Sequence, residues 1–342
     1  MNLIIVVLLT FQLINLVIGY TWSNANNAGI RSWTSIASSS DGKKIVSCVM
    51  GGSIWSSTDG GFYWTQISNS TLLSMPWQGV SSSSDGQYIV AITFGGHIYL
   101  STDGAKDFLN IASSPSTSWQ SVACSSNCSN FVAAASNGYL YYFYDYGTKY
   151  YNTDSGKRFW NAVALSDNGQ YIVAILDDYI YISSDYGNIW SYNNLFGNWQ
   201  AVACSSDGSI IVIAANKGYI YVSKDYGSTW SNNNNSSGIN YWHSLTISSD
   251  GKRIAAGANN DDIYLSSDSG ASWESANAGK NNWQSLISSS DGSLIVAAAY
   301  GDSIYTNTAP VSTNSAPQKA SLVFSSFYMM IVGLISIRLY LL

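Results

Sequence analysis

The chain has 342 residues, a net charge of −6 and only 10% charged residues, whereas it contains 29 Gly, 25 Tyr and 13 Trp. This composition favours pleated sheets and tight turns over helices. The 14 Lys and Arg residues are not clustered, which argues against a surface that binds nucleic acid.

The chain begins with residues 1–19, an almost uninterrupted run of apolar residues rich in Leu, Ile and Val. Val17 and Gly19 are small or medium residues that fit cleavage before Tyr20. We therefore predict a signal peptide over residues 1–19, although the usual Lys or Arg near its start is absent. A buried core strand is the alternative interpretation.

A tryptophan marker then recurs along the chain, followed by a small residue, an apolar residue and usually Ser-Ser-Asp-Gly. The seven marker positions are Trp33, Trp77, Trp119, Trp160, Trp199, Trp242 and Trp283. Their spacing of about 42 residues is typical of propeller blades built from four strands each. The sequence therefore predicts an all-β fold, a seven-bladed β-propeller over residues 20–308.

Each repeat predicts the same order of strands. In the fifth repeat, residues 199–204 are expected to form the inner strand, 209–215 an apolar strand covered on both faces, and 219–223 the third strand. The last repeat stops near Thr306, while residues 20–22 match a fourth strand without a repeat of its own. We therefore predict that the N-terminal strand completes the last blade and closes the ring.

A second pattern, Ser-x-Asp-x-Gly-x-x-Trp, follows the third strands; residues 223–230 are one copy. Its Ser and Asp side chains are expected to bond the amides of a tight turn, its Gly to adopt a left-handed backbone conformation, and its Trp to fold back as an apolar plug. Two copies, beginning at Ser101 and Phe143, are degraded. The aspartates to which we assign this structural role are Asp59, Asp103, Asp145, Asp185, Asp225 and Asp268.

This pattern resembles the Asp-box (bacterial neuraminidase) repeat of β-propellers in the group of sialidases, sortilins and photosystem II assembly factors. The resemblance spans nearly the whole chain between its two ends. Sialidases need an arginine triad and a Tyr nucleophile paired with Glu, whereas the repeats hold only Arg31, Arg158 and Arg253. The single glutamate, Glu274, directly follows an Asp-box Trp on the blade rim. Sialidase activity is therefore not expected.

Two other members of this group provide alternatives. Xyloglucanase-type glycosidases resemble this chain and use paired aspartates, so an extracellular glycoside hydrolase is one alternative. The acids preceding third strands are its candidates: Asp177, Asp178, Asp261, Asp262 and Asp302. Other repeats have plain Gly turns here, which favours solvated turn carboxylates. A photosystem II assembly factor-like protein is the other alternative, although the basic patch of that family is not evident.

Recognition is expected at the end of the propeller that carries the second-to-third loops and the connections between blades. These segments are rich in Asn, Ser and Tyr and vary between repeats, as binding loops on a rigid scaffold do. We predict a non-enzymatic, monomeric binding protein for a glycan or a surface protein, without cofactor or metal. Its candidate ligand-binding residues are the five acids above and His97. The recurring tryptophans are expected to pack between blades rather than to stack on sugars.

The four cysteines divide into two kinds. Cys124 and Cys128 straddle a turn and are predicted to form a disulfide. Cys48 and Cys204 lie in apolar strands and are predicted to be buried free thiols. Predicted glycosylation sites are Asn69, Asn127, Asn234 and Asn235.

The C-terminal region predicts a membrane anchor. Residues 309–321 form a linker rich in Ser, Pro and Ala, and residues 322–342 form a hydrophobic tail. Small residues at Asn314 and after it, a polar spacer and the tail match a signal for GPI attachment, with Ser312 as an alternative site. A single transmembrane segment is the competing interpretation. Both predict a protein tethered to the extracellular face of the plasma membrane.

Overall fold

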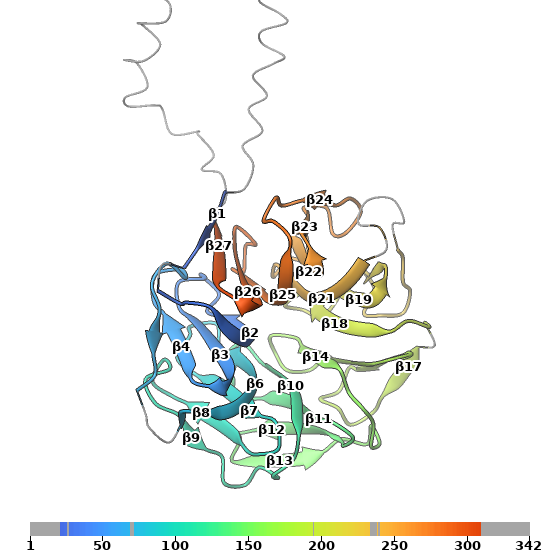
Figure 1. Ribbon diagram of the computed structural model, residues 1–342. Helices are drawn as coiled ribbons and strands as arrows, with labels where there is room; N and C mark the ends of the chain where they lie inside the picture. The colour runs from blue at the N-terminus through green and yellow to red at the C-terminus, as the bar shows by residue number, and fades with distance from the viewer. Residues whose placement is uncertain are drawn as a thin grey trace, which may run out of the picture. The chain divides into compact units, whose positions relative to one another are not determined.

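The computed structural model describes residues 21–25, 27–68, 72–193, 195–232, 238 and 240–308. The regular structure in these ranges consists of β-strands (Figure 1). Within them no helix is long and apolar enough to cross a membrane. The predicted signal peptide, linker, lipid-attachment site and tail lie outside the described residues, as do Asn69, Asn234 and Asn235.

The strands form antiparallel groups, each with an inner, a second, a third and an outer strand. The inner strands are β2 (Arg31–Ser38), β6 (Met75–Ser82), β10 (Trp119–Cys124), β14 (Ala162–Leu165), β18 (Trp199–Cys204), β21 (Asn240–Ile247) and β25 (Asn281–Ser288). The second strands are β3 (Ile45–Gly52), β7 (Ile89–Thr93), β11 (Phe131–Ala135), β15 (Ile172–Leu176), β19 (Ile211–Gly218), β22 (Ile254–Asp261) and β26 (Leu294–Asp302).

The third and outer strands complete the groups. The third strands are β4 (Ile54–Ser57), β8 (Ile98–Ser101), β12 (Leu140–Tyr144), β16 (Tyr179–Ser183), β20 (Ile220–Ser223), β23 (Ile263–Ser266) and β27 (Ile304–Thr308). The outer strands are β5 (Thr65–Gln66), β9 (Leu109–Asn110), β13 (Lys149–Asn152), β17 (Ser191–Asn193), β24 (Glu274–Ser275) and β1 (Thr21–Asn24). Beside β20, a single bridge joins Val222 to Ser231.

The second strands are the most apolar because neighbours cover them on both faces. All five residues of β7 and of β11 are buried. Their Ile, Val, Ala, Phe and Thr side chains contain no charge whose burial would need compensation. The sequence predicts this pattern, an apolar strand that is covered on both faces.

The N-terminal strand pairs with the far end of the chain. β1 runs antiparallel to β27, from Thr21 opposite Thr308 to Asn24 opposite Tyr305. The Trp22 ring lies 6.3 Å from the ring of Trp283, and its indole N–H donates to a backbone carbonyl at 3.1 Å. β1 is therefore the outer neighbour of β27.

Neighbouring groups also contact one another side by side. Each inner strand contacts the next along the chain, and β25 contacts β2. A relay of backbone hydrogen bonds of 2.6 to 3.1 Å follows the same path, with each N–H donating to the carbonyl of the next residue. It runs through Ser40, Ser84, Ser126, Asp167, Ser206, Ser249 and Ser290, whose N–H donates to the carbonyl of Ser40.

The marker tryptophans are buried, with at most 1% of their surface exposed. Each meets an aromatic ring of the third strand in its own group; Trp199 and Tyr221, for example, have centroids 5.3 Å apart and planes at 88°. The Trp242 indole donates to the Gly218 carbonyl of the preceding group at 2.9 Å. These side chains therefore pack within and between groups.

Two cysteines are bonded and two are free. Cys124 and Cys128 form a disulfide, with Cα atoms 4.9 Å apart. Cys48 is buried and Cys204 is half-buried, and burial raises the pKa of both thiols to about 12. The thiols are therefore protonated at neutral pH and poorly reactive.

Candidate functional site

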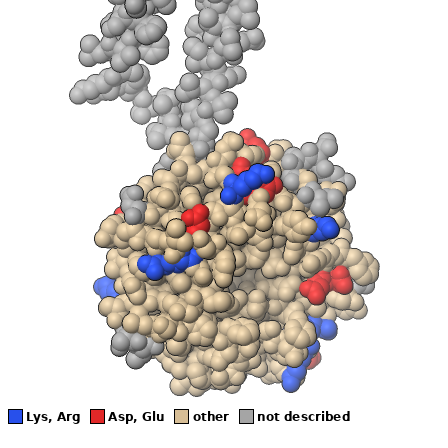
Figure 2. Space-filling view, viewed as in Figure 1, with Lys and Arg blue, Asp and Glu red and all other residues tan. Residues whose placement is uncertain are grey.

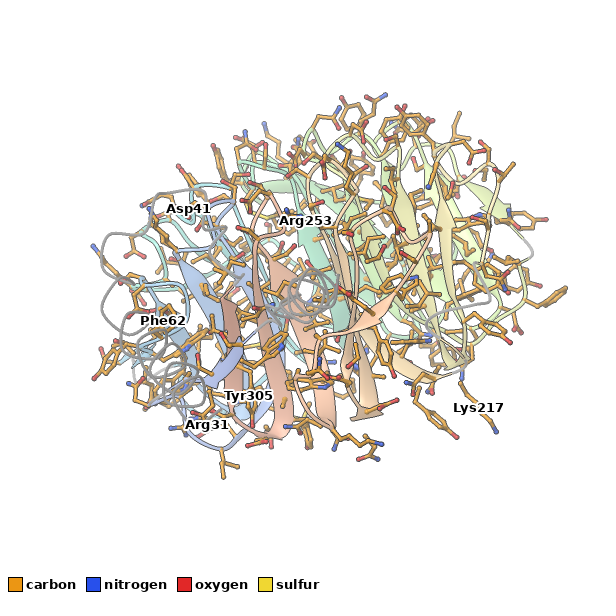
Figure 3. All side chains as sticks on the ribbon, turned by 90° about the horizontal axis from the view of Figure 1, so that it is seen from above. Arg31, Asp41, Phe62, Lys217, Arg253 and Tyr305 are labelled. Atoms are coloured by element: carbon orange, nitrogen blue, oxygen red, sulfur yellow. A yellow bond between two sulfur atoms is a disulfide. The ribbon has the colours of Figure 1, made fainter. Side chains whose placement is uncertain are left out.

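The strand groups present two different ends. Asp41 and Arg253 lie at one end and Arg31 and Lys217 at the other (Figure 3). We call the first the turn end; it carries the relay from Ser40 to Ser290 and the Ser-x-Asp-x-Gly turns. We call the second the hairpin end; it carries the hairpins that join second and third strands, where the chain reverses over residues 50–53, 94–97, 136–139, 176–179, 216–219, 259–262 and 300–303.

At the turn end, the polar side chains of the Ser-x-Asp-x-Gly pattern form hydrogen bonds within the turn itself. The Ser223 hydroxyl donates to Asp225 at 2.7 Å and accepts the Gly227 N–H at 2.8 Å. Thr229 donates its N–H and its hydroxyl to Asp225 at 2.8 and 2.6 Å. Gly227 has a φ of +82°, a conformation that other residues rarely adopt. These groups are positioned to hold a turn rather than a substrate.

Four other copies of the pattern share the hydrogen bond between the Ser hydroxyl and the Asp carboxylate, and one copy lacks it. The hydroxyl–carboxylate bond recurs at 2.7 to 2.9 Å; its further pairs are Ser57–Asp59, Ser101–Asp103, Ser183–Asp185 and Ser266–Asp268. The degraded copy at Phe143 lacks the serine. There Asp145 instead forms an ion pair with Lys149, at 3.4 Å.

We expect these turns to lose stability in acid. Hydrogen bonds from Ser272 lower the pKa of Asp268 to about 2, below its ordinary value of 3.8. Because the pKa of Asp268 is lower in the folded state than in the unfolded state, its ionised carboxylate stabilises the fold above about pH 4. This stabilisation is lost as the pH falls towards 2. Urea unfolding should therefore separate wild type from Asp268→Asn at pH 7 and bring the two together at pH 2. If the difference in unfolding free energy between the two proteins were unchanged at pH 2, the ionised Asp268 carboxylate would not be its cause.

The acids predicted to bind a ligand have internal partners at the hairpin end. Asp261 accepts the Asn240 side-chain amide at 2.7 Å, and Asp302 accepts that of Asn281 at 2.6 Å. Asp262 accepts the N–H groups of residues 277 and 278 and the hydroxyl of Ser275. To the predicted turn carboxylates the structure therefore adds hydrogen bonds, which come from the first residues of the inner strands β21 and β25 and from the segment 275–278.

The remaining candidates are less constrained. Asp177 is exposed and accepts the Asn161 side-chain amide at 3.2 Å, whereas Asp178 is exposed at the tip of its hairpin. His97 is half-buried, and its Nδ1 has no hydrogen-bond partner among the described residues. Across the described ranges, no three His, Cys, Asp or Glu side chains are placed to hold a metal ion. The candidates are distributed over separate hairpins.

An apolar patch lies at the hairpin end between the first two groups. Met50 of β3 pairs with Pro76 of β6, and the Phe94 N–H donates to the Pro76 carbonyl at 2.8 Å. Met50, Pro76 and Phe94, which we call the apolar patch, are all exposed. Large exposed apolar side chains that adjoin on a rigid sheet are a common feature of interaction surfaces.

An axial cavity of about 190 Å³ opens at the centre of the same end. Residues from every inner strand line it, and at its wall lie the residues that directly follow the marker tryptophans: Thr34, Gln78, Gln120, Asn161, Gln200, His243 and Gln284. None of the described residues lining it is Lys, Arg, Asp or Glu. The central hollow of this face is accordingly uncharged, with the charged side chains placed around it (Figure 2).

Sequence reasoning missed this cavity, although a signal was present. Four of the seven repeats have Gln directly after the marker tryptophan. The recurrence does not enter the prediction above, which assigns this segment to an inner strand that packs between blades. A polar residue at a fixed repeat position beside a buried Trp is the signal that would have identified it.

No protein-family model and no curated protein matches the sequence. Among solved structures the chain is similar to YCF48 from Cyanidioschyzon merolae, with a TM-score of 0.66 and 14% identity over 85% of this chain and 99% of that chain. It is similar to "YCF48 bound to D1 peptide", with a TM-score of 0.66 and 12% identity over 85% and 95%. It is also similar to the β-propeller domain of Cps50 (Swd1) from Myceliophteria thermophila, with a TM-score of 0.67 and 14% identity over 83% and 99%.

These likenesses establish the fold. The chain is an all-β protein of the β-propeller class. Identities of this size do not carry function from one propeller to another.

Proposed function

We propose that this chain is a non-enzymatic binding propeller that recognises a protein segment through its hairpin end. The observation that carries the proposal is an exposed apolar patch and an open axial cavity at the same end of a scaffold of paired strands. The opposite end commits its polar groups to turns and to the backbone relay. A structural neighbour bound to a peptide supports a protein partner over a glycan.

The finer architecture is part of the proposal. We take the strand groups to be seven blades, with β1 closing the last blade and the Ser-x-Asp-x-Gly turns as Asp-boxes. The return of the backbone relay to Ser40 and the pairing of β1 with β27 support this interpretation. We further propose that the protein is monomeric and is held at the cell surface by its C-terminal region. Failure of phosphatidylinositol-specific phospholipase C to release it would reject the GPI form of that anchor.

The binding proposal is tested by selecting peptides from a random 12-residue phage library on the immobilised full-length protein. Met50→Ser with Phe94→Ser should weaken the selected peptides by about tenfold or more, because the variant loses apolar contact area. Phe62→Ser is the matched control, since Phe62 is 44% exposed and Phe94 50%, and Phe62 lies in a Ser-x-Asp-x-Gly turn rather than at the hairpin end (Figure 3). Both variants should keep the melting temperature of wild type, because the three substituted residues are exposed.

Three outcomes would overturn the proposal. One is the absence of any selected peptide, together with binding on a glycan array. Another is peptide binding that Phe62→Ser weakens and the Met50/Phe94 variant leaves unchanged. The last is hydrolysis of a polysaccharide by wild type that is lost on replacing Asp177 and Asp178, which would favour the glycosidase alternative.

A further inference from the structure

The residues that line the axial cavity are set there by a repeated irregularity of the inner strands. The pairing of inner and second strands shifts register directly after the marker tryptophan in six groups; the shifts span Trp33/Ser35, Trp77/Gly79, Trp119/Ser121, Trp199/Ala201, Trp242/Ser244 and Trp283/Ser285. The residue left out of each ladder is among those that line the cavity. A β-bulge redirects a side chain in this way and is common beside functional sites.

The polar side chains of the cavity differ in whether they already have partners. The Thr34 hydroxyl donates to the Trp77 carbonyl at 3.2 Å, and the Asn161 amide donates to the Trp199 carbonyl at 2.7 Å. His243 Nδ1 lies 3.3 Å from the backbone carbonyl of Gln284. These three side chains are therefore used in joining neighbouring groups.

Four carboxamides remain open to a ligand. Among the described residues, the side-chain amides of Gln78, Gln120, Gln200 and Gln284 form no hydrogen bond with the protein, although all four residues are half-buried. Each carboxamide offers two N–H donors and one carbonyl acceptor. These amides face an open cavity and are half-buried, so a ligand that replaces their water can form hydrogen bonds with them.

The chemistry of the wall selects one class of ligand. Because none of the lining residues carries a fixed charge, a charged group would be desolvated there without compensation. Burial lowers the pKa of His243, so this imidazole is neutral at neutral pH. No Trp, Tyr or Phe belongs to the described lining, so the cavity lacks the aromatic faces on which sugar rings stack. A carboxamide wall instead matches amides, which donate and accept together.

We propose that Gln78, Gln120, Gln200 and Gln284 form an amide-binding ring that takes the main-chain or carboxamide groups of an uncharged peptide segment. The inference rests on the proposed function, because it places part of the partner segment in the axial cavity. It adds a polar anchor to the contacts of the apolar patch. Four of the seven positions around the cavity are Gln, and Thr34, Asn161 and His243 occupy the other three. Because the glutamines are therefore unevenly spaced, the entering segment has a preferred orientation.

A small probe tests the ring independently of any selected peptide. N-acetylglycinamide, a neutral diamide, is titrated against the full-length protein by saturation-transfer NMR, with acetate and methyl α-glucoside as probes of other classes. The diamide is expected to bind with a dissociation constant on the order of 10 mM, as its few atoms allow. Acetate and the glucoside should bind at least about tenfold more weakly, because of charge desolvation and the missing stacking surface.

The matched variants separate the ring from the rest of the surface. Gln120→Leu with Gln284→Leu keeps side-chain size and removes the amides, and should abolish the diamide signal. Its melting temperature should equal or exceed that of wild type, because no protein hydrogen bond is lost. Gln87→Leu, the same substitution at the turn end, should leave binding intact; there the amide donates to the Thr102 carbonyl.

Several other results would contradict the proposed amide-binding ring. Diamide binding that survives in the double variant places the probe elsewhere, and a lack of diamide binding to wild type removes the site. Tighter, Gln-dependent binding of the glucoside would make it a sugar site. Selected peptides that depend on Met50 and Phe94 and ignore the glutamines would leave the proposed function standing and reject the ring alone.

Discussion

Deleting residues 21–25 is expected to lower the stability of the propeller severely. The deletion removes β1, which pairs with β27 at four positions, and with it the contact between Trp22 and Trp283. An antiparallel pairing of four positions contains roughly four backbone hydrogen bonds, and at about 1 kcal/mol for each their loss costs about 4 kcal/mol. For a domain of this size that loss corresponds to a fall in melting temperature of roughly 8–15 °C.

The freed edge of β27 is a second consequence. An unpaired strand offers its N–H and carbonyl groups to other chains, so the deletion variant should aggregate at concentrations where wild type does not. Trp22→Ala keeps the backbone pairing and should show a smaller loss. Calorimetry with light scattering measures both effects. An unchanged melting temperature in the deletion variant would reject ring closure by β1.

Trp199→Ala is the second substitution with a large expected effect. Trp199 has no exposed surface, meets Tyr221 edge-to-face at 5.3 Å, and donates its indole N–H to the Leu195 carbonyl at 2.9 Å. Removing the ring leaves a large cavity between groups, with an expected cost of about 3–5 kcal/mol. Chemical denaturation, with the slope compared as well as the midpoint, measures this loss.

Phe196→Ala is the control for this substitution, because Phe196 is an aromatic residue of the same connection and 76% exposed. It should change stability by no more than about 0.5 kcal/mol. If the marker tryptophans served as a platform for ligands instead, Trp199→Ala would reduce binding and leave the unfolding free energy near that of wild type. That result would contradict the packing role.

The two ends of the propeller differ in how many polar groups remain available. At the turn end, hydroxyl, carboxylate and backbone groups bond one another in a pattern that repeats from group to group. At the hairpin end, the four glutamine side-chain amides form no hydrogen bond with described residues, and the residues of the apolar patch are exposed. The hydrogen bonds at the turn end stabilise the fold, whereas the side chains at the hairpin end remain available to a binding partner.

Much of this fold was predictable because the repeat is local and strongly patterned. Each second strand is a short apolar run bounded by turn residues, so its position follows from residue order alone. The Ser-x-Asp-x-Gly turns are likewise determined within eight residues, as the bonds of Ser223 and Thr229 to Asp225 illustrate. The Cys124–Cys128 disulfide belongs to the same class, since its partners are four residues apart.

What the sequence by itself determined is therefore the set of strands, their order and the turns that join them, all of which depend on neighbours along the chain. The tertiary structure alone decided which polar side chains form hydrogen bonds within the protein and which face the open cavity. Asp261 and Asp302 accept amides from residues 21 positions earlier in the chain. The glutamines after the marker tryptophans meet around one cavity only because bulged inner strands from distant repeats converge there. No local pattern encodes that convergence, since it arises from packing between groups rather than within them.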